Sequence, residues 1–393
     1  MLETGCSARS KVKLRGGEVM KRTRVLSVFG TRPEAIKMAP LIKELDNRPD
    51  QFESIVVVTA QHREMLDQVL KIFDIEPDHD LNMMKKGQSI AQITTGALLG
   101  LEAVLKEEMP DIVLVHGDTS TTFAAALSAF YQQIPVGHVE AGLRTYDKYS
   151  PFPEEMNRQL TGVIADLHFA PTEKARKYLL SENKRAETIT VTGNTSIDAM
   201  KTTVQDDYSH PILEQYPNEK MILLTAHRRE NIGENLEHIF YAIKKLVEKH
   251  KDIYVVYPVH LNPKVQKAAR NILGEQPRIH LIEPLDVRNF HNLLSQAYLI
   301  MTDSGGIQEE APSLGVPVLV LRGTTERPEG IEAGTLKLVG TNENDIYEQA
   351  DLLLTNQEAY TIMAESKNPY GDGKASERIA DELHNYFQVK QDI

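Results

Sequence analysis

Cysteine, tryptophan and long hydrophobic runs are scarce or missing in this chain of 393 residues. The single cysteine, Cys6, has no partner for an internal disulfide and supplies no set of thiolates for a metal cluster. No apolar run approaches the ~20 residues that a membrane-spanning helix needs. These absences favour a cytoplasmic enzyme over a disulfide-rich secreted domain or a membrane protein.

Several short catalytic motifs are also missing. The sequence contains no G-x-G-x-x-G fingerprint, no G-x-x-x-x-G-K phosphate loop and no G-x-S-x-G elbow. A nicotinamide or flavin dinucleotide, ATP hydrolysis and serine hydrolysis are therefore disfavoured. Neither a cysteine pair nor an H-E-x-x-H motif indicates a metal, and we predict no metal site.

The charge balance limits the kinds of partner. Lysine and arginine number 44 against 56 aspartates and glutamates, a formal net charge of −12. This acidic balance argues against nonspecific binding of nucleic acid through a basic face. It does not exclude an anionic small molecule, because the local placement of arginine and lysine decides that.

The alternation of strand-like and helix-like segments predicts the fold. Apolar, β-branched runs alternate with helical patterns along most of the chain, which indicates parallel sheets covered by helices. The strands are too many for one ordinary sheet, so we predict an α/β fold of two Rossmann-like domains with a central cleft. Residues 1–20 are expected to be a disordered extension or an expression remnant. The first domain is assigned to residues 21–192 and completed by a C-terminal helix at about 376–393; the second domain is assigned to 193–375.

The run from Asp303 to Glu310 is the most informative stretch of the sequence. It reads Asp-Ser-Gly-Gly-Ile-Gln-Glu-Glu and follows a buried-type strand. Its small residues leave backbone N–H groups uncovered where a helix is expected to begin, which suits a phosphate. The two carboxylates that follow are within reach of sugar hydroxyls. A nucleoside diphosphate fits this pattern, although a tight strand-to-helix turn in any α/β protein fits it too.

Positive charge follows other predicted strands. Arg32 and Lys37 come after the first strand and can face a phosphate at the mouth of the cleft, or belong to a solvated turn. Arg327 lies in a polar loop after the last strand and is a second candidate for phosphate. Phe290 can stack on a base, although an aromatic residue on a helix is more often part of the core.

Three carboxylates are candidates for acid/base work. Asp118 and Glu140 follow successive strands, and Glu154 comes shortly afterwards. Crowding in one cleft would raise one or more of their pKa values toward neutrality. Each has an ordinary structural alternative, such as a helix cap for Asp118 or a first-turn position for Glu154. His227, with two arginines beside it, can assist an anionic leaving group or be a structural histidine.

Six motifs together resemble a known family. They are Phe29–Lys37, His116–Thr119, His138–Arg144, Pro153–Arg158, His227–Asn231 and Asp303–Glu310. In their order and over about residues 22–385, the chain is similar to the bacterial non-hydrolysing UDP-N-acetylglucosamine 2-epimerases. The resemblance implies two Rossmann-like domains of the glycosyltransferase-B type and a homodimer.

The resemblance also implies a reaction. Members of this family interconvert UDP-GlcNAc and UDP-ManNAc without an added cofactor and so supply ManNAc units for cell-surface polysaccharide. UDP leaves by anti elimination as the C2 proton is removed, which gives 2-acetamidoglucal, and UDP then adds back after protonation on the other face. Two groups that handle protons on opposite faces are therefore required.

Site residues follow from the matching motifs. Asp118, Glu140 and Glu154 correspond to the acid/base candidates, with the base and the acid unassigned, and His227 supports the leaving UDP. The positions expected to contact UDP are Arg32, Lys37, Arg158, Phe290, Ser304, Gly305, Gly306, Glu310 and Arg327.

A second nucleotide-sugar site is implied as well. Gln61, Gln88, Arg228 and His260 match the positions at which UDP-GlcNAc activates bacterial members of the family. This chain lacks the arginine expected just before Gln88.

Three other functions compete with the epimerase. A retaining glycosyltransferase with the same fold would need an acceptor, and a hydrolysing epimerase would release free ManNAc and UDP. A non-catalytic sensor would bind the nucleotide sugar without turnover, but several carboxylates around UDP would then be an unexplained electrostatic cost.

Overall fold

The computed structural model describes residues 22–391 apart from 61–62, 84, 86 and 326. The predicted extension at residues 1–20 and the candidate Gln61 lie outside the described residues. None of the helices that the structure describes has both the length and the apolar character needed to cross a bilayer.

The first half of the chain forms a seven-stranded parallel sheet in the order β3-β2-β1-β4-β5-β6-β7. Its strands are β1 (Thr23–Phe29), β2 (Phe52–Val58), β3 (His79–Asp80), β4 (Ile112–His116), β5 (Val136–Val139), β6 (Leu167–Ala170) and β7 (Ile189–Val191). The helices between them are α1 (Arg32–Asp46), α2 (Arg63–Ile72), α3 (Ile90–Glu108), α4 (Ser120–Tyr131), α5 (Glu154–Ile164), α6 (Glu173–Ser181) and the 3-10 helix η1 (Ala186–Thr188).

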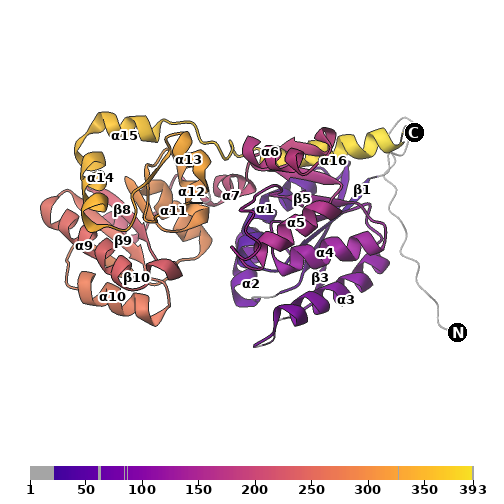
Figure 1. Ribbon diagram of the computed structural model, residues 1–393, viewed down its shortest axis with the longest axis horizontal. Helices are drawn as coiled ribbons and strands as arrows, with labels where there is room; N and C mark the ends of the chain where they lie inside the picture. The colour runs from indigo at the N-terminus through magenta and orange to yellow at the C-terminus, as the bar shows by residue number, and fades with distance from the viewer. Residues whose placement is uncertain (1–21, 61–62, 84, 86, 326, 392–393) are drawn as a thin grey trace.

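The second half forms a six-stranded parallel sheet in the order β10-β9-β8-β11-β12-β13. Its strands are β8 (Lys220–Thr225), β9 (Ile253–Pro258), β10 (Ile279–Ile282), β11 (Leu299–Thr302), β12 (Val318–Val320) and β13 (Leu336–Leu338). The helices from residue 195 onward are α7 (Thr195–Thr203), α8 (Pro211–Gln215), η2 (Arg229–Asn231), α9 (Glu234–Lys249), α10 (Pro263–Leu273), α11 (Val287–Gln296), α12 (Gly305–Glu310), η3 (Ala311–Leu314), α13 (Pro328–Glu332), α14 (Glu343–Thr355), α15 (Gln357–Ala364) and α16 (Ala375–Gln391). The predicted α/β fold of two Rossmann-like parts is confirmed (Figure 1).

Both faces of each sheet are buried, which explains the continuous apolar runs of the strands. Successive side chains of a strand point to opposite faces. In β1, Val25 and Phe29 pack with α1 and α16, whereas Leu26 and Val28 pack with α3 and α4. The second sheet is covered in the same way by α9, α10 and α14 on one face and by α11 on the other.

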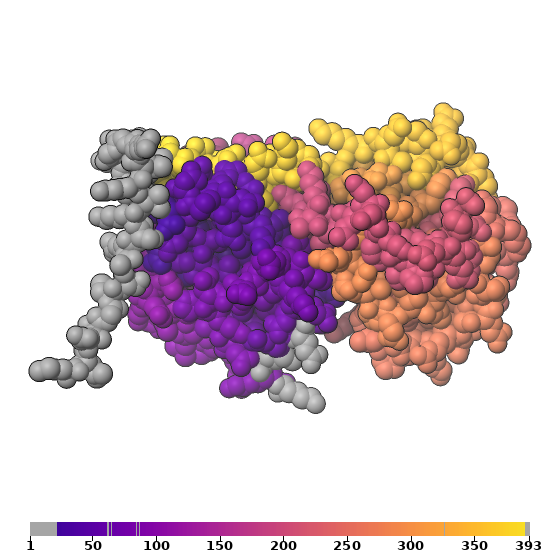
Figure 2. All heavy atoms as spheres, turned by 180° about the vertical axis from the view of Figure 1, so that it is seen from behind, coloured from indigo at the N-terminus to yellow at the C-terminus, as the bar shows by residue number. Residues whose placement is uncertain are grey.

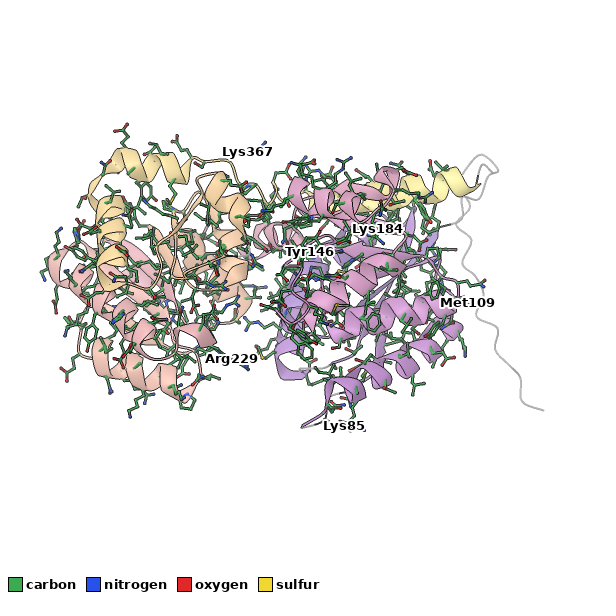
Figure 3. All side chains as sticks on the ribbon, viewed as in Figure 1. Lys85, Met109, Tyr146, Lys184, Arg229 and Lys367 are labelled. Atoms are coloured by element: carbon green, nitrogen blue, oxygen red, sulfur yellow. The ribbon has the colours of Figure 1, made fainter. Side chains whose placement is uncertain are left out.

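The chain crosses between the two halves twice, and the two crossing segments lie side by side. The backbone N–H of Asn194 donates to the carbonyl of Tyr370 at 2.7 Å. Gly193 and Gly371 have φ values of +90° and +130°, and a Cβ on Gly193 would lie 3.2 Å from the Cα of Gly371. Glycine is needed at both positions because side chains fit neither the backbone angle nor the space. Lys367 lies on the second crossing, which leads to α16 (Figure 3).

Helix α16 returns to the first half of the chain. Its buried residues Ile379, Ala380 and Leu383 pack in the same apolar cluster as α1, and the C-terminal segment runs along one edge of both halves (Figures 1 and 2). This helix corresponds to the one predicted to complete the first domain. The domain boundary itself, placed at residues 192–193, stays a prediction.

Candidate active site

Loops that follow the carboxyl ends of strands in the two sheets meet at one place. In open parallel sheets this is the edge where ligands bind. The loops after β1, β4 and β5 come from the first half, and the loop after β11 comes from the second. Lys37, on α1, contacts Glu309 in the helix after β11, and Arg32 contacts Leu285 in the loop after β10, so the two halves meet here.

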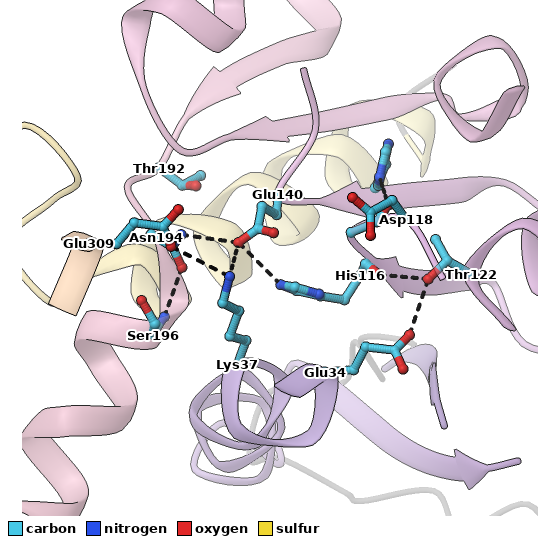
Figure 4. A network of polar contacts seen from close by, with 12 residues as sticks. Glu34, Lys37, His116, Asp118, Thr122, Glu140, Thr192, Asn194, Ser196 and Glu309 are labelled. Atoms are coloured by element: carbon cyan, nitrogen blue, oxygen red, sulfur yellow. Dashed lines mark hydrogen bonds and ion pairs between the residues drawn. The ribbon is translucent and has the colours of Figure 1, made fainter. Parts of the chain in front are cut away.

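Lys37 lies at the centre of the contacts between the halves (Figure 4). Its ammonium group donates to Glu140 Oε2 and lies 3.6 Å from Glu309 Oε2. The Asn194 amide donates to both carboxylates, at 3.0 Å to Glu140 and 2.9 Å to Glu309. The guanidinium of Arg327 donates to the other oxygen of Glu309 at 2.7 Å. Two buried carboxylates, one from each half, thus share one lysine and one amide.

The charges of this cluster hold Glu140 in its ionised form. Burial alone would raise the pKa of Glu140, but Lys37 and the nearby His116 outweigh burial and lower it to about 2. Burial likewise tends to lower the pKa of Lys37, but Glu140 and Glu309 outweigh it and leave the pKa of the lysine raised. Glu140 is therefore a carboxylate and Lys37 a cation at neutral pH.

Asp118 has the opposite tendency. Burial raises the pKa of its carboxyl group, and Glu140 and Glu154 oppose its ionisation, whereas Arg158 favours it. The Arg158 guanidinium donates to Asp118 Oδ2, and the Asn157 amide donates to the Asp118 carbonyl at 2.9 Å. The structure thus brings the three predicted carboxylates close enough to influence one another. Arg158 is hydrogen-bonded to Asp118, and its expected contact with UDP stays a prediction.

Glu34 fixes the loop after β1 against the start of α4. The Thr31 hydroxyl accepts from the Glu34 N–H, and the Glu34 carboxylate accepts from the backbone and hydroxyl of Thr31 at 2.8 and 2.7 Å. Its other oxygen accepts from the Thr119 and Thr122 hydroxyls at 2.7 and 3.2 Å. Because Thr119 directly follows Asp118, these bonds fix the helix of Lys37 relative to Asp118.

The predicted phosphate loop in the second half is followed by only a short helix. Ser304 precedes α12, which has six residues and then tightens into the 3-10 helix η3. The helix predicted to begin after Ser304 is present, and it is short because Pro312 cannot continue the α-helical hydrogen bonds. A Cβ on Gly305 would lie 2.6 Å from Arg327 Nη1. Glycine at this position lets the arginine lie against the loop.

Glu310 and Arg32 approach each other from opposite halves. Burial raises the pKa of Glu310 to about 7, with Lys37 opposing this rise and Glu309 adding to it. The charge of Glu310 acts on Arg32, whose guanidinium also donates to the carbonyl of Leu285 at 3.5 Å. Phe290, on the neighbouring α11, is half-buried and packs partly against the core, so its predicted contact with the base stays a prediction.

His227 follows β8 beside residues assigned to the second site. Its ring stacks on that of His260, with centroids 4.9 Å apart and planes 7° from parallel, and Arg228 is the next residue. Gln88 accepts from the Lys85 N–H in the turn before α3. The structure thus brings His260 and Arg228 to His227, and the assignment of a second site stays a prediction.

Comparisons with known proteins agree on one family. The family model described as UDP-N-acetylglucosamine 2-epimerase matches residues 43–384. The UDP-N-acetylglucosamine 2-epimerase of Bacillus subtilis is 62% identical over 373 residues, which cover 95% of this chain and 98% of the relative. The chain belongs to the UDP-N-acetylglucosamine 2-epimerase family.

Two solved structures with ligands are similar to this epimerase-family protein. The co-structure of S. aureus MnaA with UDP is 56% identical, with a TM-score of 0.86, and covers 93% of this chain and 97% of its own. The Neisseria meningitidis UDP-GlcNAc 2-epimerase bound to UDP-GlcNAc is 52% identical, with a TM-score of 0.84, and covers 92% and 100%. These matches confirm the family resemblance that the six motifs predicted.

Three residues of the epimerase site are missing from the sequence-based assignment. Glu34 and His116 lie inside the recognised motifs, and their positions in those motifs were the available signal. Glu309 was expected near sugar hydroxyls, and in the structure it contacts Lys37 and Arg327. Asn194 lies at the crossing between the halves, and no local pattern indicates that its amide contacts two carboxylates. Within the described ranges, no group of three or more His, Cys, Asp or Glu side chains is arranged to hold a metal ion.

Replacing Lys37 with methionine should make the loss of stability depend on pH. Methionine keeps an apolar stem but leaves the buried carboxylates without their shared cation, which costs about 3–5 kcal/mol. Without Lys37 the pKa of Glu140 should rise above its ordinary value, so the cost should be largest at pH 7 and smaller at pH 5, where protonation removes the buried charge.

In the unsubstituted protein, Glu140 has the opposite effect on stability. Because the pKa of Glu140 is lowered in the folded protein, its ionised form adds to the free energy of unfolding at every pH above the ordinary pKa of glutamate. This contribution is lost only as the pH falls toward about 2. Urea unfolding midpoints at pH 7 and pH 5 measure the difference. Lys43→Met, which removes a half-exposed lysine of the same helix, is the control. If Lys37→Met lowers the urea unfolding midpoint equally at both pH values, the prediction is contradicted.

Proposed function

We propose that this protein reversibly interconverts UDP-GlcNAc and UDP-ManNAc by inverting C2 of the sugar. The observation that carries the proposal is the pair of partly buried carboxylates Asp118 and Glu140, whose pKa values shift in opposite directions. Lys37 and Arg158 from the first half contact this pair, and the charge of Arg327 from the second half acts on Glu140. The relative from Neisseria meningitidis, whose structure is bound to UDP-GlcNAc, supports the choice of substrate.

The reaction begins with loss of UDP. A carboxylate takes the C2 proton, the electrons of that C–H bond form the C1=C2 double bond, and the C1–O bond breaks with its electrons on UDP. The intermediate is 2-acetamidoglucal. Return of a proton to the opposite face of C2 and addition of UDP to C1 give the epimer. No oxidation occurs overall, so the step needs no redox cofactor.

The two carboxylates have the properties that this sequence of steps requires. Glu140 is ionised and can accept a proton, whereas burial makes Asp118 easier to protonate. Glu154 acts on the charge of Asp118 from the first turn of α5. One base and one acid are thus available at the start of a turnover, and they exchange roles in the reverse direction.

The diphosphate is proposed to bind where cations and uncovered N–H groups meet. Lys37 and Arg327 now contact Glu309, and a diphosphate would compete with this carboxylate for both. The N–H groups of Gly305 and Gly306 and the side chain of Arg32 complete the anion site. Glu310 can accept from the ribose hydroxyls, and Phe290 can lie along the uracil.

The wider setting follows from the same family resemblance. We infer that the enzyme acts as a cytoplasmic homodimer and supplies ManNAc units for cell-surface polysaccharide. Activation by UDP-GlcNAc would use a second site near Arg228 and His260. The epimerase names of the relatives favour this function over a retaining glycosyltransferase.

Epimerisation in heavy water tests the proposed function. UDP-GlcNAc incubated with the protein in D2O, without metal or nicotinamide, should yield UDP-ManNAc that carries deuterium at C2. Proton NMR detects both the new epimer and the loss of the C2 proton signal. An unchanged spectrum at high enzyme concentration would contradict the proposal, and accumulation of free ManNAc would indicate the hydrolysing reaction instead.

Removing each carboxylate charge should slow turnover while UDP still binds. Asp118→Asn, Glu140→Gln and Glu154→Gln should each lower kcat by about 10²-fold or more, because a proton-transfer group is lost. The Kd for UDP, measured by calorimetry, should change by only a few fold. Glu173→Gln is a matched control because Glu173 also lies in the first turn of a helix and is exposed. Near-normal turnover in all three variants would show that the assignment is wrong.

A further inference from the structure

A buried carboxylate at the end of β11 has only one of its two oxygens hydrogen-bonded. Asp303 is fully buried. Its Oδ2 accepts from the backbone N–H groups of His227 and Arg228 at 2.7 and 2.8 Å and from the Asn231 amide at 3.1 Å. Its Oδ1 has no hydrogen-bond partner within the part of the chain that the structure describes. An unsatisfied buried carboxylate oxygen is costly and calls for a functional explanation.

The side chain of His227 lies next to this oxygen. Strands β8 and β11 pair in parallel with Thr225 opposite Thr302, and the Asp303 N–H donates to the Thr225 carbonyl at 3.0 Å. This register places the segment after β8 over the Asp303 carboxylate. His227 Nδ1 lies 3.9 Å from Asp303 Oδ1, which is too long for a hydrogen bond and within the range of an ion pair.

The other groups around His227 disfavour its positive charge. Burial lowers the pKa of His227, the stacked His260 and the adjacent Arg228 lower it further, and Asp303 opposes them. Tyr257, on β9, donates its hydroxyl to the Ala226 carbonyl at 2.6 Å and stays neutral. Among these neighbours Asp303 supplies the negative charge that favours a protonated His227.

We propose that Asp303 is a positioning residue, which orients His227 through Nδ1 and stabilises its imidazolium form while UDP departs. The inference rests on the proposed function for its role in turnover. With Nδ1 directed to Asp303, Nε2 on the other edge of the ring is available to donate to the β-phosphate. The carboxylate orients the ring and stabilises its charge without taking the proton, as a carboxylate does beside a catalytic histidine in general.

The same residue connects two parts of the anion site. Asp303 lies two residues before Gly305, where α12 begins, and its side chain accepts from the backbone N–H groups of His227 and Arg228. A change at Asp303 could therefore act on backbone placement alone. Asparagine separates the two roles, because its oxygen can still accept from both N–H groups while its NH2 group replaces the charged oxygen next to His227.

The experiment is an NMR titration of His227 in the full chain labelled with ¹⁵N-histidine and saturated with UDP. The His227 signals are assigned by their absence in His227→Gln. In Asp303→Asn the pH midpoint of His227 should fall by at least one unit, a tenfold change in proton affinity, because the stabilising anion is gone. An unchanged midpoint would overturn the proposal. This readout needs no turnover, so it fails or succeeds independently of the epimerase assignment.

Turnover provides a second readout. Loss of the anion lowers the pH at which His227 loses its proton, so the alkaline limb of kcat should move to lower pH and kcat at pH 7.5 should fall at least tenfold. If Asp303 acts through His227, then His227→Gln combined with Asp303→Asn should be no slower than His227→Gln alone. Additive losses would contradict the proposal.

Two controls separate positioning from folding. Asp198 is also a buried carboxylate that accepts from two backbone N–H groups, those of Ala375 and Ser376. Asp198→Asn should lower Tm without moving the His227 midpoint; a shift as large as that of Asp303→Asn would overturn the proposal. If Asp303→Asn does not fold, the tautomer of neutral His227 in the unsubstituted protein tests the proposal instead. The ring should carry its proton on Nδ1, and a proton on Nε2 would contradict the inference.

Discussion

The charge of Lys37 is the constraint on which the rest of the site depends. A buried ammonium group is tolerated only with close anionic partners, and its partners Glu140 and Glu309 come from opposite halves of the molecule. The Asn194 amide donates to the same two carboxylates and so also holds them close together. One cation thus fixes how the halves meet and also determines the ionisation of Glu140. A change that separates the two halves would therefore also change the protonation of Glu140.

The scaffold explains why these groups meet at all. Each parallel sheet delivers its polar loops to one edge, and the two crossing segments around Gly193 and Gly371 bring the two edges together. Glu34 fixes the helix of Lys37 to the start of α4, and Asp303 fixes the loop of His227 to the end of β11. Both are buried carboxylates that accept several N–H or O–H groups. The site therefore uses carboxylates for position as well as for proton transfer.

The fold and the loops of the site were predictable from the sequence because both depend on local patterns. Apolar runs buried on both faces identify parallel strands, and polar motifs after them identify the loops. The exact partners were less predictable. Glu309 and Glu310 are adjacent, and only the placement of the short helix α12 decides which one faces Lys37. The contact of Asn194 with Glu309 joins residues 115 positions apart, which no local pattern encodes.

The central claim is that UDP leaves the sugar and returns within the site. UDP-GlcNAc labelled with ¹⁸O in the bond between C1 and the β-phosphate tests this directly, because departure lets the phosphate rotate before re-addition. The account predicts that ³¹P NMR of the recovered UDP-GlcNAc will show the label moving into non-bridging positions of the β-phosphate while epimerisation proceeds. Epimer formed with the label retained entirely in the bridge would contradict the account, since C2 would then invert without cleavage of the C1–O bond.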